Sequence, residues 1–223
     1  MPWRPPGTVD EAQRARERAQ LIAGAALLRL RLSERDAERL LTLLDELERW
    51  SRAYNLTAVR ERPEMLTHHL LDSLAIHGDL EGTRIADVGT GAGFPGLPLA
   101  LIAPARAFTL IDSNQKKLRF VDHVARVLGL ANVTTAHARV ERMRAGPPFD
   151  TVVARAFAPL PQLIEQVRGL MGPETRLLAM KGRLHPEELE AVPSGWQIRE
   201  QRPLEVPGLG AVRHLVVLGS RER

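Results

Sequence analysis

A glycine-rich segment, Asp87 to Gly96, constrains the fold of this chain more than any other feature. It joins a short apolar run to the start of a helical pattern. Glycine has no Cβ, so the backbone can turn sharply there and approach a ligand, while the helix N-terminus beyond it offers free N–H groups. Because this unit is typical of cofactor loops in parallel α/β proteins, the sequence predicts such a domain.

The spacing of the glycines fits two kinds of cofactor loop. Gly91-x-Gly93-x-x-Gly96 matches the dinucleotide fingerprint, whereas Asp87-x-Gly89-x-Gly91-x-Gly93 matches the first motif of S-adenosylmethionine-dependent methyltransferases. Phe94 and Pro95 favour the second interpretation, because a dinucleotide loop must leave room for a pyrophosphate. A glycine-rich turn without a ligand stays open as an alternative, since one such motif is a weak signal.

From residue 84 onward, short apolar runs alternate with helical patterns, which predicts a parallel sheet. Pro207-Gly208-Leu209-Gly210 separates the last two runs, so they should pair as an antiparallel hairpin at the sheet edge. The predicted strands are 84–89, 107–112, 132–136, 150–155, 175–180, 196–206 and 211–218, with helices at 95–103, 115–128, 138–143 and 159–171. The hairpin favours a class I S-adenosylmethionine-dependent methyltransferase: an α/β, Rossmann-like, seven-stranded mixed sheet.

Helical patterns also precede the sheet. Residues 10–30, the segment after a capping box at Ser33, and residues 63–76 have helical spacing, so 10–80 should form an N-terminal helical region. Residues 1–9 contain three prolines and show no periodicity, which predicts a flexible arm. Residues 81–223 would then form the methyltransferase domain.

The composition narrows the classes of function. The chain has 223 residues and no cysteine, which excludes disulfides, thiolate metal sites and a Cys nucleophile. No apolar run approaches the roughly 20 residues of a membrane span, and the start lacks a signal-peptide core, so we expect a cytoplasmic protein without a membrane partner. The net charge of +4 and a sequence pI near 10.2 permit an anionic partner such as RNA.

Two strand ends carry charged candidates for the site. Asp112 could accept hydrogen bonds from ribose hydroxyls, or cap the next helix. Arg155 stands where many amine-directed nucleic-acid methyltransferases carry an Asn/Asp-Pro-Pro-aromatic tetrapeptide, and it offers only donors. Without that tetrapeptide or a cysteine, a ring nitrogen such as guanine N7 is the favoured acceptor, and orientation matters more than a general base. A salt bridge closing the strand end is the alternative role of Arg155.

Polar residues also gather before the sheet and at the other strand ends. Asn55, His69 and Asp72 stand among apolar neighbours just before the cofactor domain, so they are candidates for RNA or substrate contacts at the mouth of the active site. His69 and Asp72 could also hydrogen-bond on one helical face. A structural histidine is the alternative, and no metal is expected because further ligands are missing. A basic rim for RNA phosphates is predicted from Lys116, Lys117, Arg119, Lys181, Arg213 and His214, although each alone is typical of a solvated surface.

Several motifs occur together between about residues 40 and 218: Asn55-Leu56-Thr57-Ala58, His69 to Leu74, Asp87 to Pro98, Leu110 to Ser113, Arg139-Val140-Glu141, Arg155-Ala156-Phe157, Lys181-Gly182 and Arg213 to Val217. In combination they closely resemble RsmG, also called GidB, the guanine-N7 methyltransferase family of small-subunit ribosomal RNA. The resemblance implies methyl transfer from S-adenosylmethionine to one guanine of bacterial 16S rRNA, as free RNA, 30S subunit or assembly intermediate. It implies cofactor contacts for Gly89, Phe94, Val140, Glu141 and Arg155, and no well-defined general base.

The methyltransferase is expected to be a monomer or to associate only weakly. Three other functions stay open on the sequence. A methyltransferase of a small molecule or protein would act without RNA and show little salt dependence. A nicotinamide-dependent oxidoreductase would bind NADH instead of S-adenosylmethionine. A non-catalytic RNA-binding module would bind RNA and transfer no methyl group.

Overall fold

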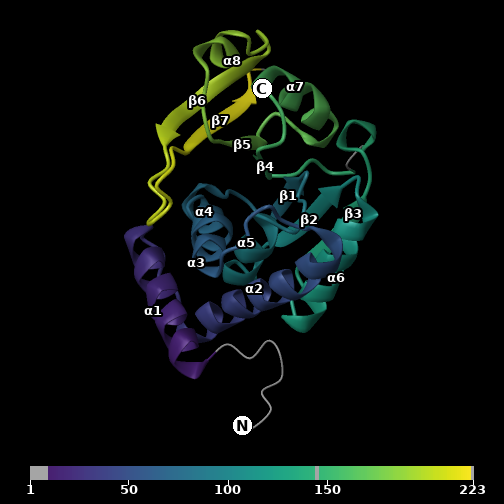
Figure 1. Ribbon diagram of the computed structural model, residues 1–223. Helices are drawn as coiled ribbons and strands as arrows, with labels where there is room; N and C mark the ends of the chain where they lie inside the picture. Colours follow the sequence, from purple (N-terminus) through teal and green to yellow (C-terminus); the bar gives the residue numbers. More distant parts are fainter. Residues whose placement is uncertain (1–9, 144–145, 222–223) are drawn as a thin grey trace, which may run out of the picture.

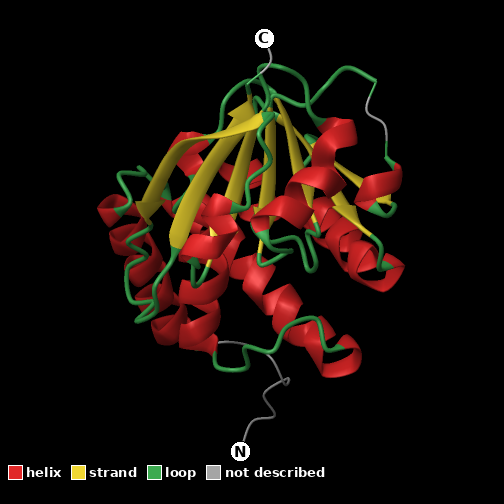
Figure 2. Ribbon diagram, turned by 90° about the horizontal axis from the view of Figure 1, so that it is seen from above, coloured by secondary structure: helices red, strands yellow, loops and turns green. Residues whose placement is uncertain are grey.

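The computed structural model describes residues 10–143 and 146–221, so the arm predicted at 1–9 lies outside the described residues. A central sheet has helices on both of its faces (Figure 1, Figure 2). None of the helices within those two ranges is long and apolar enough to cross a membrane. The α/β class and the helices before the sheet, both predicted from the sequence, are confirmed.

The described residues form a seven-stranded sheet in the order β3-β2-β1-β4-β5-β7-β6. Its strands are β1 (Arg84–Val88), β2 (Ala107–Asp112), β3 (Val133–His137), β4 (Thr151–Arg155), β5 (Arg176–Lys181), β6 (Trp196–Pro203) and β7 (His214–Ser220). The first five strands run parallel, and β7 pairs antiparallel with β5 and β6. The predicted mixed sheet with a C-terminal hairpin is therefore confirmed, and the carboxyl ends of β1, β2 and β4 meet at one edge.

The hairpin strands are offset from the predicted ranges. β6 ends at Pro203 and β7 begins only at His214, so the connection is longer than the four residues expected. Pro203 and Pro207 carry no N–H for the ladder, and Gly208 adopts a positive φ of 76°, which turns the chain away from the sheet.

The helices surround the sheet and differ from the prediction in three places. They are α1 (Glu11–Leu27), α2 (Glu34–Tyr54), α3 (Arg62–Met65), the π-helix η1 (Leu66–Leu71), α4 (Asp72–Leu74), η2 (His77–Asp79), α5 (Gly96–Ile102), α6 (Gln115–Val127), η3 (Val140–Arg142), α7 (Leu160–Val167), η4 (Arg168–Leu170) and α8 (Pro186–Glu190). The helix predicted at 138–143 is only one 3-10 turn, the helix predicted at 63–76 contains a π-helical turn, and α8 was not predicted because it buries no apolar face.

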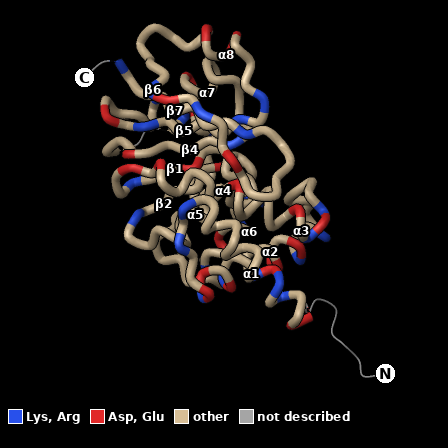
Figure 3. Tube along the Cα trace, turned by 90° about the vertical axis from the view of Figure 1, so that its left-hand side faces the viewer, with Lys and Arg blue, Asp and Glu red and all other residues tan. Residues whose placement is uncertain are grey.

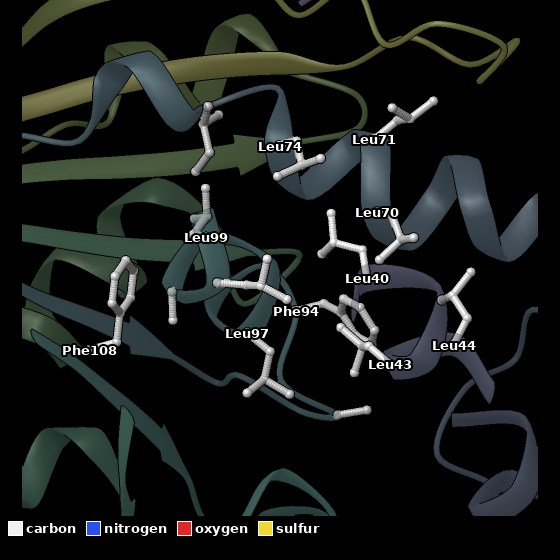
Figure 4. Packing of buried hydrophobic residues seen from close by; sticks show 14 of the residues in the cluster. Leu40, Leu43, Leu44, Leu70, Leu71, Leu74, Phe94, Leu97, Leu99 and Phe108 are labelled. Carbon is white, nitrogen blue, oxygen red and sulfur yellow. The ribbon is translucent and has the colours of Figure 1, made fainter. Parts of the chain in front are cut away.

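The larger hydrophobic core joins the N-terminal helices to the glycine-rich loop. Leu40 and Leu44 of α2 and Leu70 of η1 pack in one cluster with Phe94 and Leu97 (Figure 4). The five leucines of α2 from Leu40 to Leu47 are all fully buried. Because successive strand residues point to opposite faces, a second core covers the other side of the sheet beneath α7. The N-terminal helices are therefore fixed relative to the loop by shared packing.

An ion-pair network also fastens the N-terminal helices together. Arg62, at the start of α3, lies 3.0 Å from Glu17 of α1, 2.8 Å from Asp45 and 3.4 Å from Glu48 of α2. Ser33 caps α2 as the predicted capping box requires, since its Oγ accepts from the Asp36 N–H, and the Asp36 carboxylate accepts from the Ser33 hydroxyl at 2.7 Å. These contacts hold the helical region in place beside the sheet edge where the site lies.

Candidate functional site

The glycine-rich loop is anchored by the carboxylate that precedes it. Asp87 is 1% exposed, and its Oδ2 accepts from the Gly96 N–H at 2.8 Å and from the Thr90 hydroxyl at 2.6 Å. Burial raises the pKa of Asp87 to about 6, while the Thr90 and Gly96 hydrogen bonds act in the opposite direction. The carboxylate therefore ties the end of β1 to the start of α5 and fixes the path of the loop.

The glycines of the loop have different roles. A Cβ at Gly89 would overlap the ring of Phe157, and one at Gly96 would lie 2.6 Å from Asp87 Oδ2, so these positions are glycine because protein atoms fill the space. A Cβ at Gly91, where φ is +59°, would meet nothing nearer than 3.9 Å. Gly91 is therefore a loop glycine whose Cβ position is open, whereas Gly89, for which the family resemblance implies a cofactor contact, lines both cavities described below and has its Cβ position filled by Phe157.

Two cavities meet at the sheet edge beside this loop. The first, cavity A, has a volume of about 400 Å³ and lies between the N-terminal helices and the loop. The second, cavity B, has a volume of about 350 Å³ and lies over the ends of β2 and β4. Gly89, Arg155 and Ala156 line both cavities, and Ala156 has a positive φ of 48°, uncommon for a residue with a Cβ. The two cavities are thus neighbours that share one wall.

Cavity B brings together five of the six predicted cofactor residues. Asp112, Val140 and Glu141 line it together with the shared residues Gly89 and Arg155. The Asp112 carboxylate accepts from the Gly91 N–H at 2.8 Å and from the Asn114 N–H at 2.7 Å, and each oxygen has a second lone pair for a hydroxyl group. Asp112 therefore supports the loop and can still receive ribose hydroxyls, whereas the predicted cap of the next helix is made by Asn114.

The other residues of cavity B also suit an adenosine group. Val140 is 5% exposed and gives an apolar wall. Gln166 lines the same cavity, and its Oε1 is buried without a hydrogen-bond partner among the described residues. A buried acceptor without a hydrogen bond lowers stability unless a ligand supplies the donor, and the adenine amino group is such a donor. Gln166 was not predicted as a site residue, because a single glutamine in a helical segment has no distinguishing pattern.

A buried ion-pair cluster lies in the wall of cavity A. Asp72 is 1% exposed, with Oδ2 3.1 Å from Arg155 Nη1 and Oδ1 3.2 Å from Arg213 Nε. Arg155 Nη1 also donates to the His68 carbonyl at 2.9 Å. The predicted alternative role of Arg155, a salt bridge at the strand end, is therefore present. Asp72, predicted as an RNA contact, instead has both oxygens on arginines.

His69 and Phe94 form a second pair in this wall. Their rings stack with centroids 4.7 Å apart, and His69 Nε2 lies 2.9 Å from the Thr57 hydroxyl. Burial, with further contributions from Arg155 and His68, lowers the pKa of His69 to about 3, so the ring is neutral near pH 7. The possible bond from His69 to Asp72 does not form, because the π-helical turn at Leu66–Leu71 alters the regular spacing and Asp72 faces the arginines.

The predicted basic rim is only partly assembled. Lys117 lines cavity A near Gly91, while Lys116 and Arg119 are exposed on α6. Lys181 also lines cavity A, but its Nζ lies 2.7 Å from Glu188 and donates to the Ala158 carbonyl at 3.1 Å. Lys181 thus fastens the segment after β4. Along the chain trace, basic and acidic residues are interspersed over the face in view (Figure 3).

Two more predicted residues lie at the edge of the site. Asn55 is exposed at the C-terminal end of α2 and accepts from Arg60 Nη2 at 3.1 Å, next to Leu56 and Thr57, which line cavity A. His214 Nδ1 is 3.1 Å from the Gly182 carbonyl. Within residues 10–143 and 146–221, no three acidic or histidine side chains are placed to hold a metal ion.

Known proteins resemble this chain over most of its length. The family model GidB, described as rRNA small subunit methyltransferase G, matches residues 36–216. The ribosomal RNA small subunit methyltransferase G of Nitrosococcus oceani is 46% identical over 201 residues, which cover 90% of this chain and 94% of that protein. The protein of the same name from Alkalilimnicola ehrlichii is 50% identical over 196 residues, covering 88% and 89%.

Solved structures of methyltransferases share the fold. Magnesium protoporphyrin IX methyltransferase from Synechocystis, with bound S-adenosylmethionine, matches with a TM-score of 0.55 at 19% identity, covering 85% of this chain and 98% of that one. TrmN from Thermus thermophilus matches with a TM-score of 0.54 at 24% identity, covering 76% and 53%. The architecture is therefore that of the class I S-adenosylmethionine-dependent methyltransferases.

Proposed function

We propose, since the chain belongs to the GidB family of rRNA small subunit methyltransferase G, that it methylates N7 of one guanine in 16S rRNA with S-adenosylmethionine as methyl donor. The observation that carries this proposal is the pair of cavities that share Gly89, Arg155 and Ala156 beside the glycine-rich loop. One cavity suits an adenosine group, and its neighbour lies under the N-terminal helices. Membership of this family excludes two of the alternative functions, the nicotinamide oxidoreductase and the non-catalytic RNA-binding module.

The cofactor residues divide between the two cavities. Asp112, Val140, Glu141 and Gln166 would hold the adenosine end in cavity B. Gly91, in the wall of cavity A, leaves space for the end that carries the methyl group. When bound, S-adenosylmethionine supplies a methyl group already activated by its sulfonium. This division supports entry of the guanine through cavity A.

The acceptor chemistry explains the residues that line cavity A. Guanine N7 attacks with its own lone pair: the sulfur–methyl bond breaks, the N7–methyl bond forms, and the positive charge passes from sulfur to the guanine. No proton leaves, so no general base is required. His69 fits this chemistry because its ring is neutral near pH 7 and therefore adds no positive charge beside a cationic methyl donor.

The arginines of cavity A can orient the base. The N7 lone pair must stay free for the methyl group, so the N–H donors of Arg155 and Arg213 would serve the neighbouring O6 or a phosphate. Positioning of this kind can lower the barrier by several kcal/mol, on the order of what effective-molarity measurements allow. Phe94 would act mainly through packing, because it is 4% exposed under His69 and Arg155.

The RNA partner would contact the exposed cations around cavity A. Lys116, Lys117, Arg119 and Arg213 are the candidates for phosphate contacts, while Asn55 and His214 lie at the edge. The enzyme would act as a monomer in the cytoplasm, on 16S rRNA, the 30S subunit or an assembly intermediate. The alternative is that a small molecule or a protein accepts the methyl group, and the following experiment distinguishes this from methylation of RNA.

The test is methyl transfer followed by identification of the nucleoside. The protein is incubated with methyl-labelled S-adenosylmethionine and with 16S rRNA or 30S subunits that lack the modification, and the RNA is digested to nucleosides. We expect label in 7-methylguanosine from one site in one of these substrates. Cofactor binding without transfer to either RNA form would contradict the proposed substrate and direct the search to small molecules or proteins.

A further inference from the structure

Asp72 is the one carboxylate among the described residues that line cavity A. The same wall carries four basic side chains, Lys117, Arg155, Lys181 and Arg213. Lys181 has an acidic partner of its own in Glu188, which does not line the cavity. The charge of cavity A therefore depends on a single acidic residue.

The geometry of Asp72 is unsuited to direct contact with RNA. The side chain is 1% exposed, and each carboxylate oxygen accepts from a different arginine. A carboxylate would also repel a phosphate. Its position at the start of α4 instead connects the N-terminal helices to Arg155 at the end of β4 and to Arg213 just before β7.

The bonds to Asp72 leave part of each guanidinium available. Arg155 uses only Nη1 for Asp72 and for the His68 carbonyl, so its Nε and Nη2 have no acceptor within the described residues. Arg213 uses Nε for Asp72 and Nη1 for the Val212 carbonyl, which leaves Nη2 without one in the same part of the chain. A guanidinium is rigid and planar, so fixing one edge also fixes the direction of the remaining donors.

We propose that Asp72 is a positioning residue that holds Arg155 and Arg213 in the wall of cavity A and offsets their charge, so that a cationic cofactor can bind beside them. This inference rests on the proposed function, because S-adenosylmethionine carries a sulfonium. Loss of the carboxylate charge would leave four basic side chains and no carboxylate among the residues that line cavity A, with Lys181 still paired to Glu188 outside the lining. Unlike the sulfonium, the thioether of S-adenosylhomocysteine is neutral, so the added repulsion acts mainly on the methyl donor.

The test compares the two cofactor forms on the full-length protein. Dissociation constants for S-adenosylmethionine and S-adenosylhomocysteine are measured by calorimetry for wild type and Asp72→Asn. Asp79→Asn is the matched control, since Asp79 pairs with Arg202 at 2.7 Å and lines neither cavity. Thermal unfolding of each variant reports whether the fold persists.

We expect Asp72→Asn to weaken S-adenosylmethionine by about tenfold or more, equivalent to about 1.4 kcal/mol, and S-adenosylhomocysteine by less than about threefold. Asp79→Asn should leave the ratio of the two affinities unchanged. An equal loss for both ligands in Asp72→Asn, or no loss, overturns the proposal. Failure of the wild type to bind either ligand would contradict the proposed function instead.

A double variant covers the case in which Asp72→Asn does not fold. Removing one partner of a buried pair destabilises far more than removing both, so Asp72→Asn with Arg213→Gln should unfold at a higher temperature than the single variant. Its formal charge equals that of wild type, and we expect its affinity ratio to stay within about threefold of the wild-type ratio, equivalent to about 0.7 kcal/mol. A ratio shifted by tenfold in this double variant would contradict charge balance as the role of Asp72.

Discussion

The substitution Gly91→Asn tests whether the open space beside Gly91 binds the cofactor, because its effect on affinity can be measured separately from its effect on stability. Gly91 has a φ of +59°, and a Cβ there would meet nothing nearer than 3.9 Å, so a side chain enters the open space of cavity A. An ordinary residue in this left-handed conformation costs roughly 1–2 kcal/mol, and Asn costs less than most. The melting temperature should therefore fall by only about 2–4 °C.

The binding effect should exceed the effect on stability. Because the Asn side chain would occupy the space beside the loop, we expect affinity for S-adenosylhomocysteine to fall by about tenfold or more, equivalent to about 1.4 kcal/mol. Calorimetric titration measures this loss, and thermal unfolding measures the strain.

Gly129→Asn is the matched control for this experiment. Gly129 also has a left-handed φ, +62°, and open space around it, but it follows α6 and lines neither cavity A nor cavity B. Both variants should lose similar stability, and only Gly91→Asn should lose affinity. Equal affinities in the two variants would refute the assignment of the open glycine to the cofactor.

Three further perturbations test separate parts of the site. Because burial lowers the pKa of His69 to about 3, the folded protein resists protonation of this ring while the unfolded chain accepts the proton. Wild type should therefore lose about 2 kcal/mol more stability than His69→Gln between about pH 6.5 and 4.5, measured by denaturant unfolding; parallel stability curves would contradict this. Lys117→Met should reduce the slope of log affinity for RNA against log salt concentration by about 0.7, whereas Lys181→Met should leave this slope unchanged. A reduced slope in Lys181→Met and an unchanged slope in Lys117→Met would show that the assignment of the basic rim is wrong. Gly89→Ala should weaken cofactor binding, because the added methyl group would displace the Phe157 ring. The double variant with Phe157→Ala should regain part of the lost affinity in the same titration, and no regain would argue against this packing.

The fold could be predicted because its signals are local. The alternation of apolar runs and helical patterns predicted where the strands lie and that most of them run parallel, and the spacing around Asp87 predicted the position of the cofactor loop. The turn at Val140–Arg142 was overestimated as a helix because periodicity over six residues cannot separate an α-helix from a 3-10 turn.

The site was predicted less completely because its contacts are distant in sequence. Asp72 meets arginines 83 and 141 residues further along the chain, so no local pattern shows that its carboxylate is fully engaged. Lys181 was predicted to be a free cation. Its partner Glu188 is close in the sequence but lies in a different element, so spacing alone does not show that the two side chains meet. The role of Gly91 likewise depends on the absence of neighbouring atoms, which spacing alone does not reveal.

A crystal structure of the protein with S-adenosylhomocysteine would show whether cavities A and B form one methyl-transfer site. We expect the adenine in cavity B beside Val140, with the sulfur at the wall that Gly89 and Arg155 share between the cavities and directed toward cavity A. Adenine in cavity A, or a sulfur directed away from cavity A, would show that the two cavities do not form such a site.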